Sequence, residues 1–517
     1  MRIFVLDISG AEHALEAEPG LTLAQVVYAG GAFEAPAICS ALGRCGKCRM
    51  RFLDPAQAGK ILPIEENIFS AEELAQGWRL GCRRLAASDL RIALPASAGP
   101  LLKTNTIVAN AEADSCGLVL DLGSTNLEWE IVSAASQHIA QGRCLNPQMG
   151  AGSEIMSRLA YAADTKRAEA LSFMVIDRIR RIVAEAPGKI ERLCIAGNPA
   201  MIYLLLNLPL GGLSAAPYHL NFKGGIRKIA PDLPTAYIPP FPSPFIGADA
   251  SAGLAFLEHE VGSLRRPYLL ADLGTNGEFI LSLSKDRYYA ASIPMGPALE
   301  GIGLSFGSVA GPGVITDFKI TPDGITPAPM PGETVERRPG ISGSGYLALV
   351  HKLLLLSLMD RQGAFRSDSP MPLAARTARN FFKNGEELYF GLSAKMFLSG
   401  QDVEQILKVK AAFNLALSSL LRASGLRSSQ LKAVYLAGAL GLYIDRACLL
   451  ELGFLPPDQH LETLGNTSLK GARLLLENMA ARQWVEELTP GIQTLDLASD
   501  LSFRNKFMDS MIFDYVP

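Results

Sequence analysis

The stretch YLLADLGTNGEFILSL at residues 268–283 repeats an earlier one, GLVLDLGSTNLEWEIV, at residues 117–132. In each, an apolar strand runs into Asp-Leu-Gly and a hydroxyl residue, and a second apolar strand follows. Self-similarity at a long spacing is typical of a repeated architecture. The sequence therefore predicts a duplicated fold whose two halves begin with the same β-hairpin.

The segments around these hairpins predict α/β layers. Further strand-like runs at 192–200 and 433–441 contain or end in glycine, and the second follows a helical pattern at 411–424. Strands that alternate with helices are typical of layered α/β domains. The proline-rich stretches 231–244 and 321–340 predict surface loops instead.

Each hairpin offers groups that bind phosphate. Its glycine lets the backbone approach closely, and successive N–H groups form an anion-binding concavity. The hydroxyls of Ser124, Thr125 and Thr275 add donors, while Asp121 and Asp272 can hold the hydrated Mg²⁺ that accompanies nucleotide phosphates. One such hairpin alone is more often ordinary turn chemistry. Two in matching contexts, followed by LAGALG before a helix, predict a nucleotide clamp.

The cysteines are unevenly placed. Four of the eight lie early in the chain, at Cys39, Cys45, Cys48 and Cys82. A four-cysteine zinc site usually pairs two knuckles, whereas here three cysteines lie close together and one lies far downstream. That layout suits a [2Fe–2S] cluster, with zinc as the alternative. The other four cysteines are scattered, and we expect them to be buried small hydrophobes; they are Cys116, Cys144, Cys194 and Cys448.

The domain organisation follows from these features. Residues 1–95 form a small cysteine-bearing domain, which begins with a strand (MRIFVLDI) and a short helix (LTLAQVVYAG). Residues 96–115 are small and polar and predict a flexible linker. Residues 116–267 form the first half of the duplicated domain, and residues 268–517 form the second.

Composition excludes several classes. Among 517 residues, 48 Lys and Arg face 51 Asp and Glu, so there is no basic surplus for binding nucleic acid. The apolar run 353–359 is far shorter than the roughly 20 residues that a membrane span needs. The N-terminus carries acidic residues where a signal peptide is apolar, which predicts a cytoplasmic protein. A G-x-S-x-G run at 303–307 lacks the flanking strand and helix of a serine hydrolase.

Nearly the whole chain resembles the reductive activators of corrinoid enzymes. The resemblance includes the cysteine pattern and, in chain order, DLGSTN, NPQMGAGSEIMSRL, GNPAMIYLLL, FIGADASAGL, LLADLGTNGEFIL, GPALEGIGLSFG, ISGSGYLALV, VYLAGALGLYID and GNTSLKGARLLL. It implies a ferredoxin-like β-grasp [2Fe–2S] domain followed by a duplicated actin-like (RNase H-like) ATPase domain. Many relatives have an extra middle domain before the ATPase, and the early first hairpin leaves no room for one here.

The resemblance also implies an activity. The protein would use ATP and Mg²⁺ to return an electron from its cluster to a corrinoid protein or cobalamin-dependent methyltransferase, reducing inactive Co(II) to Co(I). An external low-potential donor would reload the cluster. Dimers are common in the superfamily, so a homodimer is possible, although the sequence identifies no interface.

Site residues carry over motif by motif. The cluster ligands would be Cys39, Cys45, Cys48 and Cys82. Asp121 and Asp272 would be the catalytic carboxylates, and the nucleotide would contact Gly123, Ser124, Thr125, Asn126, Gly274, Thr275, Asn276, Gly438 and Gly441. Glu300 and the turn 343–345 have no assigned role.

Rival functions remain open at this stage. An ATP-driven electron donor to another low-potential enzyme, like the activators of 2-hydroxyacyl-CoA dehydratases, would share DLGSTN but not the fused ferredoxin domain. A redox adaptor gated by nucleotide would bind ATP without turnover. A small-molecule kinase would leave the ferredoxin domain unexplained.

Overall fold

The computed structural model describes the chain except residues 8, 19, 30–32, 34, 36–42, 44, 45, 96–105, 108–114, 153, 302, 331–339, 369, 370, 394, 395, 439–443, 457, 458 and 498–501. The chain forms two compact units. One comprises Met1–Ala252 and Ser468–Val485, and the other comprises Gly253–Thr467 and Glu486–Pro517.

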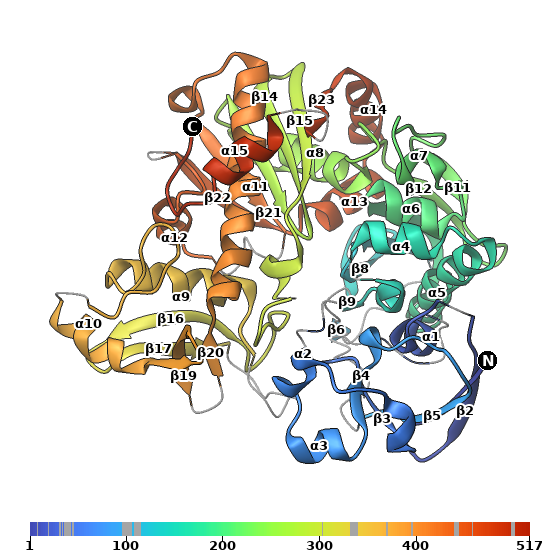
Figure 1. Ribbon diagram of the computed structural model, residues 1–517. Coiled ribbons are helices and arrows are strands. Elements are labelled where there is room, and N and C mark those ends of the chain that lie inside the picture. Colours follow the sequence, from blue (N-terminus) through green and yellow to red (C-terminus); the bar gives the residue numbers. More distant parts are fainter. Residues whose placement is uncertain are drawn as a thin grey trace. The chain divides into compact units, whose positions relative to one another are not determined.

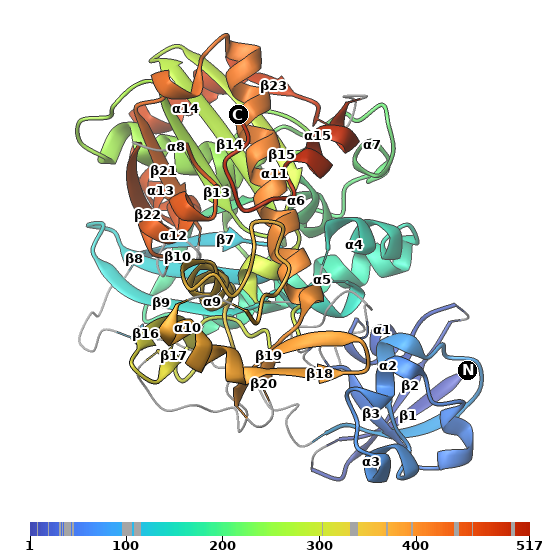
Figure 2. The same ribbon diagram turned by 60° about the vertical axis from the view of Figure 1, so that its left-hand side comes forward.

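The N-terminal part of the first unit is a mixed five-stranded sheet in the order β2-β1-β5-β3-β4. Its strands are β1 Arg2–Leu6, β2 Glu12–Glu16, β3 Arg49–Phe52, β4 Trp78–Leu80 and β5 Leu90–Ala93. The outer strand pairs are antiparallel, while β1 and β5 are parallel. This is the β-grasp arrangement that the sequence predicts, and it is drawn in blue in Figure 2.

Short capped helices accompany this sheet: α1 Leu23–Tyr28, α2 Pro63–Glu66 and α3 Ala71–Ala75, with the 3₁₀ turns η1 Pro55–Ala58 and η2 Gly81–Arg83. Thr22 and Ser70 cap α1 and α3 in capping boxes, each accepting a bond from the backbone N–H three residues later. The strand and helix that the sequence predicts at the N-terminus are confirmed as β1 and α1.

A larger seven-stranded sheet in the same unit has the order β11-β12-β10-β7-β8-β9-β6. Its strands are β6 Thr106–Ile107, β7 Ser115–Leu122, β8 Asn126–Ser133, β9 His138–Leu145, β10 Lys189–Gly197, β11 Gly225–Lys228 and β12 Thr235–Ile238. β7, β8 and β9 form an antiparallel meander, and β10 and β12 continue the sheet in parallel on the β7 side. Figure 2 shows β7 to β10 side by side.

Apolar helix faces cover this sheet. The helices are α4 Ile155–Tyr161, α5 Thr165–Ala184, α6 Pro199–Leu205 and α7 Gly211–Ser214, followed by α8 Ala248–Glu260, in which the chain passes to the second unit. The chain returns in α13 Thr467–Glu477 and leaves again in α14 Met479–Leu488. Buried side chains of β7, α5 and α6 belong to one continuous core.

The second unit repeats the same plan. Its six-stranded sheet has the order β22-β21-β13-β14-β15-β23, with β13 Tyr268–Leu273, β14 Asn276–Ser284, β15 Arg287–Pro294, β21 Ala433–Ala437, β22 His460–Gly465 and β23 Gln493–Leu495. β13, β14 and β15 form the meander, and β21 and β22 extend it in parallel. The order β9-β8-β7-β10-β12 in one unit therefore matches β15-β14-β13-β21-β22 in the other, which confirms the predicted duplication.

Helices and small sheets complete the second unit. They are α9 Gly343–Leu355, α10 Pro372–Thr377, α11 Gly400–Ser424, α12 Arg446–Glu451 and α15 Phe503–Asp509, the hairpin β16 Ile315–Thr321 with β17 Gly324–Pro329, and the sheet β18 Phe381–Asn384, β19 Glu387–Ser393 and β20 Met396–Leu398. The long helix α11, orange in Figure 1, packs against β14 and β15. Ser399 and Asp402 cap its start and left-handed Gly425 ends it, so the helix begins well before the predicted 411.

Each of the two proline-rich stretches that the sequence predicts to be a loop contains a strand, and residues 331–339 of the second lie outside the described residues. β12 lies within the first stretch, and β17 lies within the second. Strand β12 has only four residues and is flanked by proline. Ala236 and Ile238 are nevertheless fully buried, because the strand pairs with β10. Tertiary pairing thus overrides the local turn signal.

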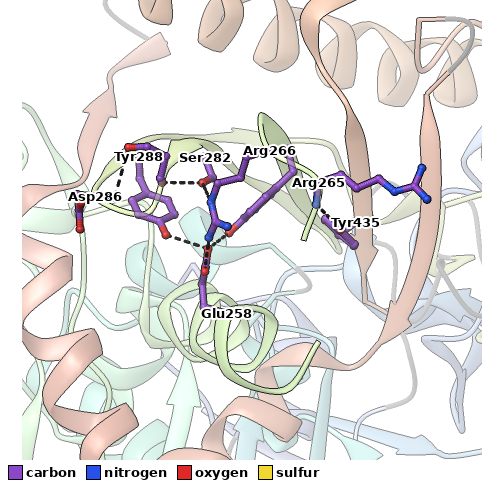
Figure 3. Close-up of polar contacts among 9 residues, drawn as sticks. Glu258, Arg265, Arg266, Ser282, Asp286, Tyr288 and Tyr435 are labelled. Carbon is purple, nitrogen blue, oxygen red and sulfur yellow. Dashed lines mark hydrogen bonds and ion pairs between the residues drawn. The ribbon is translucent and has the colours of Figure 1, made fainter. Parts of the chain in front are cut away.

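A buried cluster of hydrogen-bonded side chains connects α8 to the sheet of the second unit (Figure 3). Glu258 accepts hydrogen bonds from Arg266, from Tyr268 and, at 2.8 Å, from the Tyr288 hydroxyl. Arg266 also donates to the Ser282 hydroxyl at 3.1 Å. The carboxylate is thus satisfied by three donors in a site where its side chain is only 10% exposed, as a buried charge requires.

Candidate functional site

The first predicted hairpin lies at the end of β7. Asp121 is the penultimate residue of the strand, and Leu122 pairs with Leu127 before the turn 123–126. Ser124 and Thr125 are buried in the turn. A Cβ on Gly123 would lie 2.7 Å from the Asn126 carbonyl oxygen, so the tight turn requires glycine there.

Two buried side chains hold the backbone of this turn from behind. The Asn146 amide donates to the Gly123 carbonyl at 2.7 Å, and the Asn146 backbone N–H donates to the Thr125 carbonyl at 2.8 Å. Arg158 is fully buried and donates to the Ser124 carbonyl and, at 2.7 Å, to the Gly152 carbonyl. These neutral and charged donors occupy the carbonyls of the turn and so fix it in one conformation, and the bond from the charged Arg158 is the stronger kind.

Carboxylates meet at the end of β7. Asp121 lies directly opposite Glu128 in the antiparallel register, so both side chains lie on one face of the sheet. Asp121 accepts a hydrogen bond of 2.9 Å from the Ser468 hydroxyl in α13, and Glu128 pairs with Arg143 at 3.2 Å. Two carboxylates on one face of a strand pair favour a bound cation.

The second hairpin repeats this geometry. Asp272 lies opposite Glu278 in the register of β13 and β14. Gly438, which follows β21, packs so closely that a Cβ would lie 2.7 Å from the Leu273 carbonyl oxygen and 2.9 Å from Asp272 Oδ1. Its φ of +88° also favours glycine. The structure therefore brings Asp272 and Gly438 together.

A short 3₁₀ turn after the third meander strand supports each hairpin. In the first unit η3 Pro147–Ala151 follows β9, and in the second η4 Pro297–Glu300 follows β15. Just before η4, the backbone N–H groups of Met295 and Gly296 donate to the Thr275 carbonyl. The Thr275 hydroxyl donates to Glu300 at 2.6 Å, so Glu300, to which the sequence assigned no role, orients the second hairpin.

Asp249 belongs to the same edge as Asp121, although the sequence analysis did not single it out. It lies in the first turn of α8, and Gly247 just before it packs against the Gly197 carbonyl at the end of β10. β10 pairs with β7 so that Ala196 lies opposite Asp121. Burial raises the pKa of the Asp249 carboxyl to about 6.

The signals for the missed carboxylates are weak in the sequence. Asp249 lies in FIGADASAGL, a motif of the resemblance, but nothing local separates it from an ordinary acidic first turn. Glu128 and Glu278 become notable only once strand register places them opposite the hairpin aspartates. Arg158 looks like a surface residue of an amphipathic helix until its burial is known.

The structure places two of the four predicted cluster ligands. Gly81 donates its backbone N–H to the Cys48 carbonyl at 2.9 Å, which brings the start of β3 beside the turn η2 that carries Cys82. Both cysteines are buried. Cys39 and Cys45, and Gly441 of the predicted adenosine side, lie outside the described residues.

The surroundings of Cys48 and Cys82 fit an iron–sulfur cluster. The Tyr28 hydroxyl is buried beside Cys48 without a hydrogen-bond partner among the described residues. A bound group with sulfur acceptors would supply one. Among the described residues, no three His, Cys, Asp or Glu side chains gather as a metal site, and two of the predicted cluster ligands are outside that set.

The scattered cysteines are largely as expected. Cys116, Cys194 and Cys448 are buried, while Cys144 is half-buried. Burial raises the pKa of the Cys194 thiol to about 12, which keeps it protonated and unreactive. In the described part of the chain, no helix is both long and apolar enough to cross a membrane.

Two family models match the chain. One is described as the C-terminal domain of RACo, the ASKHA domain, and matches residues 266–515. The other is the RACo middle region and matches residues 116–260. The expectation that the chain has no room for a middle region is therefore wrong.

Similar proteins are found among both sequences and structures. The corrinoid activation enzyme RamQ of Eubacterium limosum is 27% identical over 77% of this chain and 70% of its own length. The [Co(II) methylated amine-specific corrinoid protein] reductase of Methanosarcina barkeri is 26% identical over 76% of each chain.

A solved structure extends the likeness of the fold to the N-terminal domain. The reductive activator for a corrinoid iron–sulfur protein matches with a TM-score of 0.68 and 20% identity, over 99% of this chain and 98% of that one. The two family models and the matched duplicated fold agree with the motif resemblance. The chain belongs to the family of reductive activators of corrinoid enzymes.

Proposed function

We propose that this protein is an ATP-dependent reductive activator of a corrinoid protein, which it returns from inactive Co(II) to active Co(I). One observation carries the proposal: a single chain joins a cysteine-bearing β-grasp domain to two matching hairpins, each with an aspartate opposite a glutamate. Electron transfer and nucleotide use are thereby combined in one molecule. The names of its corrinoid-activating relatives support the same activity.

The nucleotide chemistry rests on the chain's own groups. The hairpin amides of residues 123–126 and 274–276 bind phosphate oxygens. The Thr275 hydroxyl, which donates to Glu300, orients the second turn. Asp121 in the first unit and Asp272 in the second are each a candidate ligand, within their own unit, for the Mg²⁺ that accompanies ATP. Asp249 is the candidate base that orients the attacking water, because a carboxyl with a pKa near 6 is largely ionised at neutral pH yet still accepts a proton.

The redox chemistry belongs to the N-terminal domain. When bound, a [2Fe–2S] cluster would supply one low-potential electron. Cys39, Cys45, Cys48 and Cys82 would hold it, and the β-grasp sheet would shield it from water. An external low-potential donor would reload it.

Nucleotide energy is needed because the electron moves uphill. Moving one electron through about 100 mV costs about 2.3 kcal/mol. ATP offsets such a cost only where it binds one conformation or complex more tightly than another. The linker that the sequence predicts at residues 96–115 lies mostly outside the described residues. The domain boundaries at 95, 115 and 267 are part of this proposal. We place the protein in the cytoplasm, where a corrinoid methyltransferase partner and the donor would meet it.

An anaerobic assay tests the proposal. Full-length protein with a reconstituted cluster, a low-potential reductant and a Co(II) corrinoid protein is followed by its visible spectrum with and without ATP. We expect ATP-dependent Co(I) formation that is lost in Cys48→Ala and retained in Cys144→Ala. Reduction that proceeds equally without ATP would contradict the proposal. An intact cluster and ATP turnover without reduction of any corrinoid protein would favour another low-potential acceptor.

A further inference from the structure

Tyr28 stands at the side of the cluster site that faces the rest of the first unit. Its helix α1 contacts the turn η2 that carries Cys82. The Leu23 N–H donates to the Arg84 carbonyl at 2.8 Å, and the Ala86 N–H donates to the Leu21 carbonyl at 2.9 Å. These bonds fix the helix against the segment that follows the last predicted cluster ligand.

The hydroxyl of Tyr28 is an unsatisfied donor. The side chain is 0% exposed, and its oxygen has no hydrogen-bond partner among the described residues. A phenol keeps its proton at neutral pH, so the group can act as a donor. A buried hydroxyl without a partner costs free energy, which a sulfur acceptor beside it would recover.

The backbone of Tyr28 touches the nucleotide-binding half directly. A Cβ on Gly150 would lie 2.3 Å from the Tyr28 carbonyl carbon, 2.4 Å from its oxygen and 2.6 Å from the Ala29 nitrogen. No side chain fits between these two backbones. An ion pair between Glu18 and Arg167 joins the same two parts of the unit nearby.

The segment that carries Gly150 also holds the first hairpin. Gly150 lies in η3, between Asn146, which donates to the Gly123 carbonyl, and Gly152, whose carbonyl accepts from Arg158. Arg158 in turn donates to the Ser124 carbonyl. A continuous series of contacts thus runs from the hairpin backbone through η3 to Gly150 and α1.

We propose that Tyr28 is a positioning residue that donates a hydrogen bond to a sulfur of the bound cluster, and that nucleotide at the first hairpin adjusts this bond through Gly150. The inference rests on the proposed function for the presence of the cluster and of ATP. A donor stabilises the reduced, more negative form and so raises the reduction potential. Because linkage is reciprocal, the two effects must be equal as free energies: the shift in reduction potential caused by nucleotide, and the change in nucleotide binding free energy caused by reduction of the cluster.

Redox titration of the full-length protein, followed by its visible spectrum, tests both parts. The variants are Tyr28→Phe, which removes only the hydroxyl, and Gly150→Ala, which separates α1 from η3. Tyr203→Phe is a control because that buried hydroxyl donates to the Phe222 carbonyl. Gly211→Ala is a second control because a Cβ there meets nothing within 4 Å. Each titration is made with and without AMPPNP.

We expect Tyr28→Phe to lower the equilibrium constant for reduction about tenfold, which is about 59 mV for one electron. AMPPNP should shift the wild-type potential, and its dissociation constant should differ between oxidised and reduced protein by the matching factor. Gly150→Ala should lose that shift while keeping its cluster spectrum, and its AMPPNP dissociation constant should then be the same in the oxidised and reduced protein. Both controls should behave as wild type.

Two results would overturn the inference. A Tyr28→Phe potential equal to that of wild type would refute the hydrogen bond, and a wild-type potential insensitive to AMPPNP would refute the coupling. If Gly150→Ala loses its cluster, the isosteric Tyr28→Phe variant still decides. A wild-type protein that assembles no cluster would instead refute the proposed function, which is a distinguishable outcome.

Discussion

Replacement of Arg158 by methionine tests how the first hairpin is held. The guanidinium is fully buried and donates to the carbonyls of Ser124 and Gly152. Hydrogen bonds to charged groups contribute about 1.5–3 kcal/mol each. Methionine keeps an unbranched apolar chain of similar length, so the loss of two such bonds should lower the free energy of unfolding by about 3 kcal/mol.

The same change should weaken nucleotide binding. A hairpin that is no longer fixed in the free protein must be ordered when phosphate binds, and each 1.4 kcal/mol of that cost reduces affinity about tenfold. We expect a tenfold or larger rise in the AMPPNP dissociation constant, measured by titration calorimetry. Arg158→Lys should be intermediate, because one ammonium cannot reproduce the planar fork.

Arg181→Met is the matched control. Its side chain is 64% exposed and pairs with Asp177 one turn earlier. The free energy of unfolding, measured in guanidinium, should therefore change by less than about 0.5 kcal/mol. An Arg158→Met variant that is less stable but binds AMPPNP like wild type would refute the reasoning, since the hairpin would then be held by other contacts.

The remaining predictions concern carboxylates. Wild-type ATP hydrolysis should rise as pH passes through about 6 and should be largely lost in Asp249→Asn, because the ionised carboxylate is the base. Because the pKa of Asp249 is raised, its contribution to stability is present below about pH 3.8 and is lost as the pH rises through about 6. The free energy of unfolding of Asp249→Asn should not show this loss. Asp121→Ala and Asp272→Ala should each impair AMPPNP binding but leave the visible cluster spectrum unchanged. Glu258→Gln should lower the free energy of unfolding by about 3–5 kcal/mol, since it leaves Arg266 as a buried charge without its carboxylate, whereas the exposed Glu404→Gln should change little.

The hairpins were predictable because their information is local. Asp-Leu-Gly between two apolar strands defines a turn wherever it occurs, and its repetition indicates a duplication before any contact is known. The cysteine spacing predicted an iron–sulfur site, because three close cysteines and a distant one suit an iron–sulfur loop; the β-grasp fold was implied by the resemblance to the family. The matching sheet orders of the two units confirm the duplication.

Other features depend on contacts between distant segments. β12 lies in a proline-rich stretch that reads as a loop, and only its pairing with β10 makes it a buried strand. The capping box of Ser399 and Asp402 sets the start of α11 at Gly400, eleven residues before the predicted start at 411.

The sequence by itself determined the duplicated α/β plan, the two Asp-Leu-Gly hairpins and the grouping of the cysteines, because each depends on residues close together in the chain. Only the tertiary structure decided which side chains from distant parts of the sequence contact the hairpins and the cysteine site. Arg158 reaches the hairpin carbonyls because α4 folds back behind β7, and Glu300 meets Thr275 because η4 follows the meander. Tyr28 stands between Cys48 and Gly150 because α1 packs on η3. Hydrogen bonds and close packing act over a few ångströms, so they favour residues that the fold brings together, whatever their separation in the sequence.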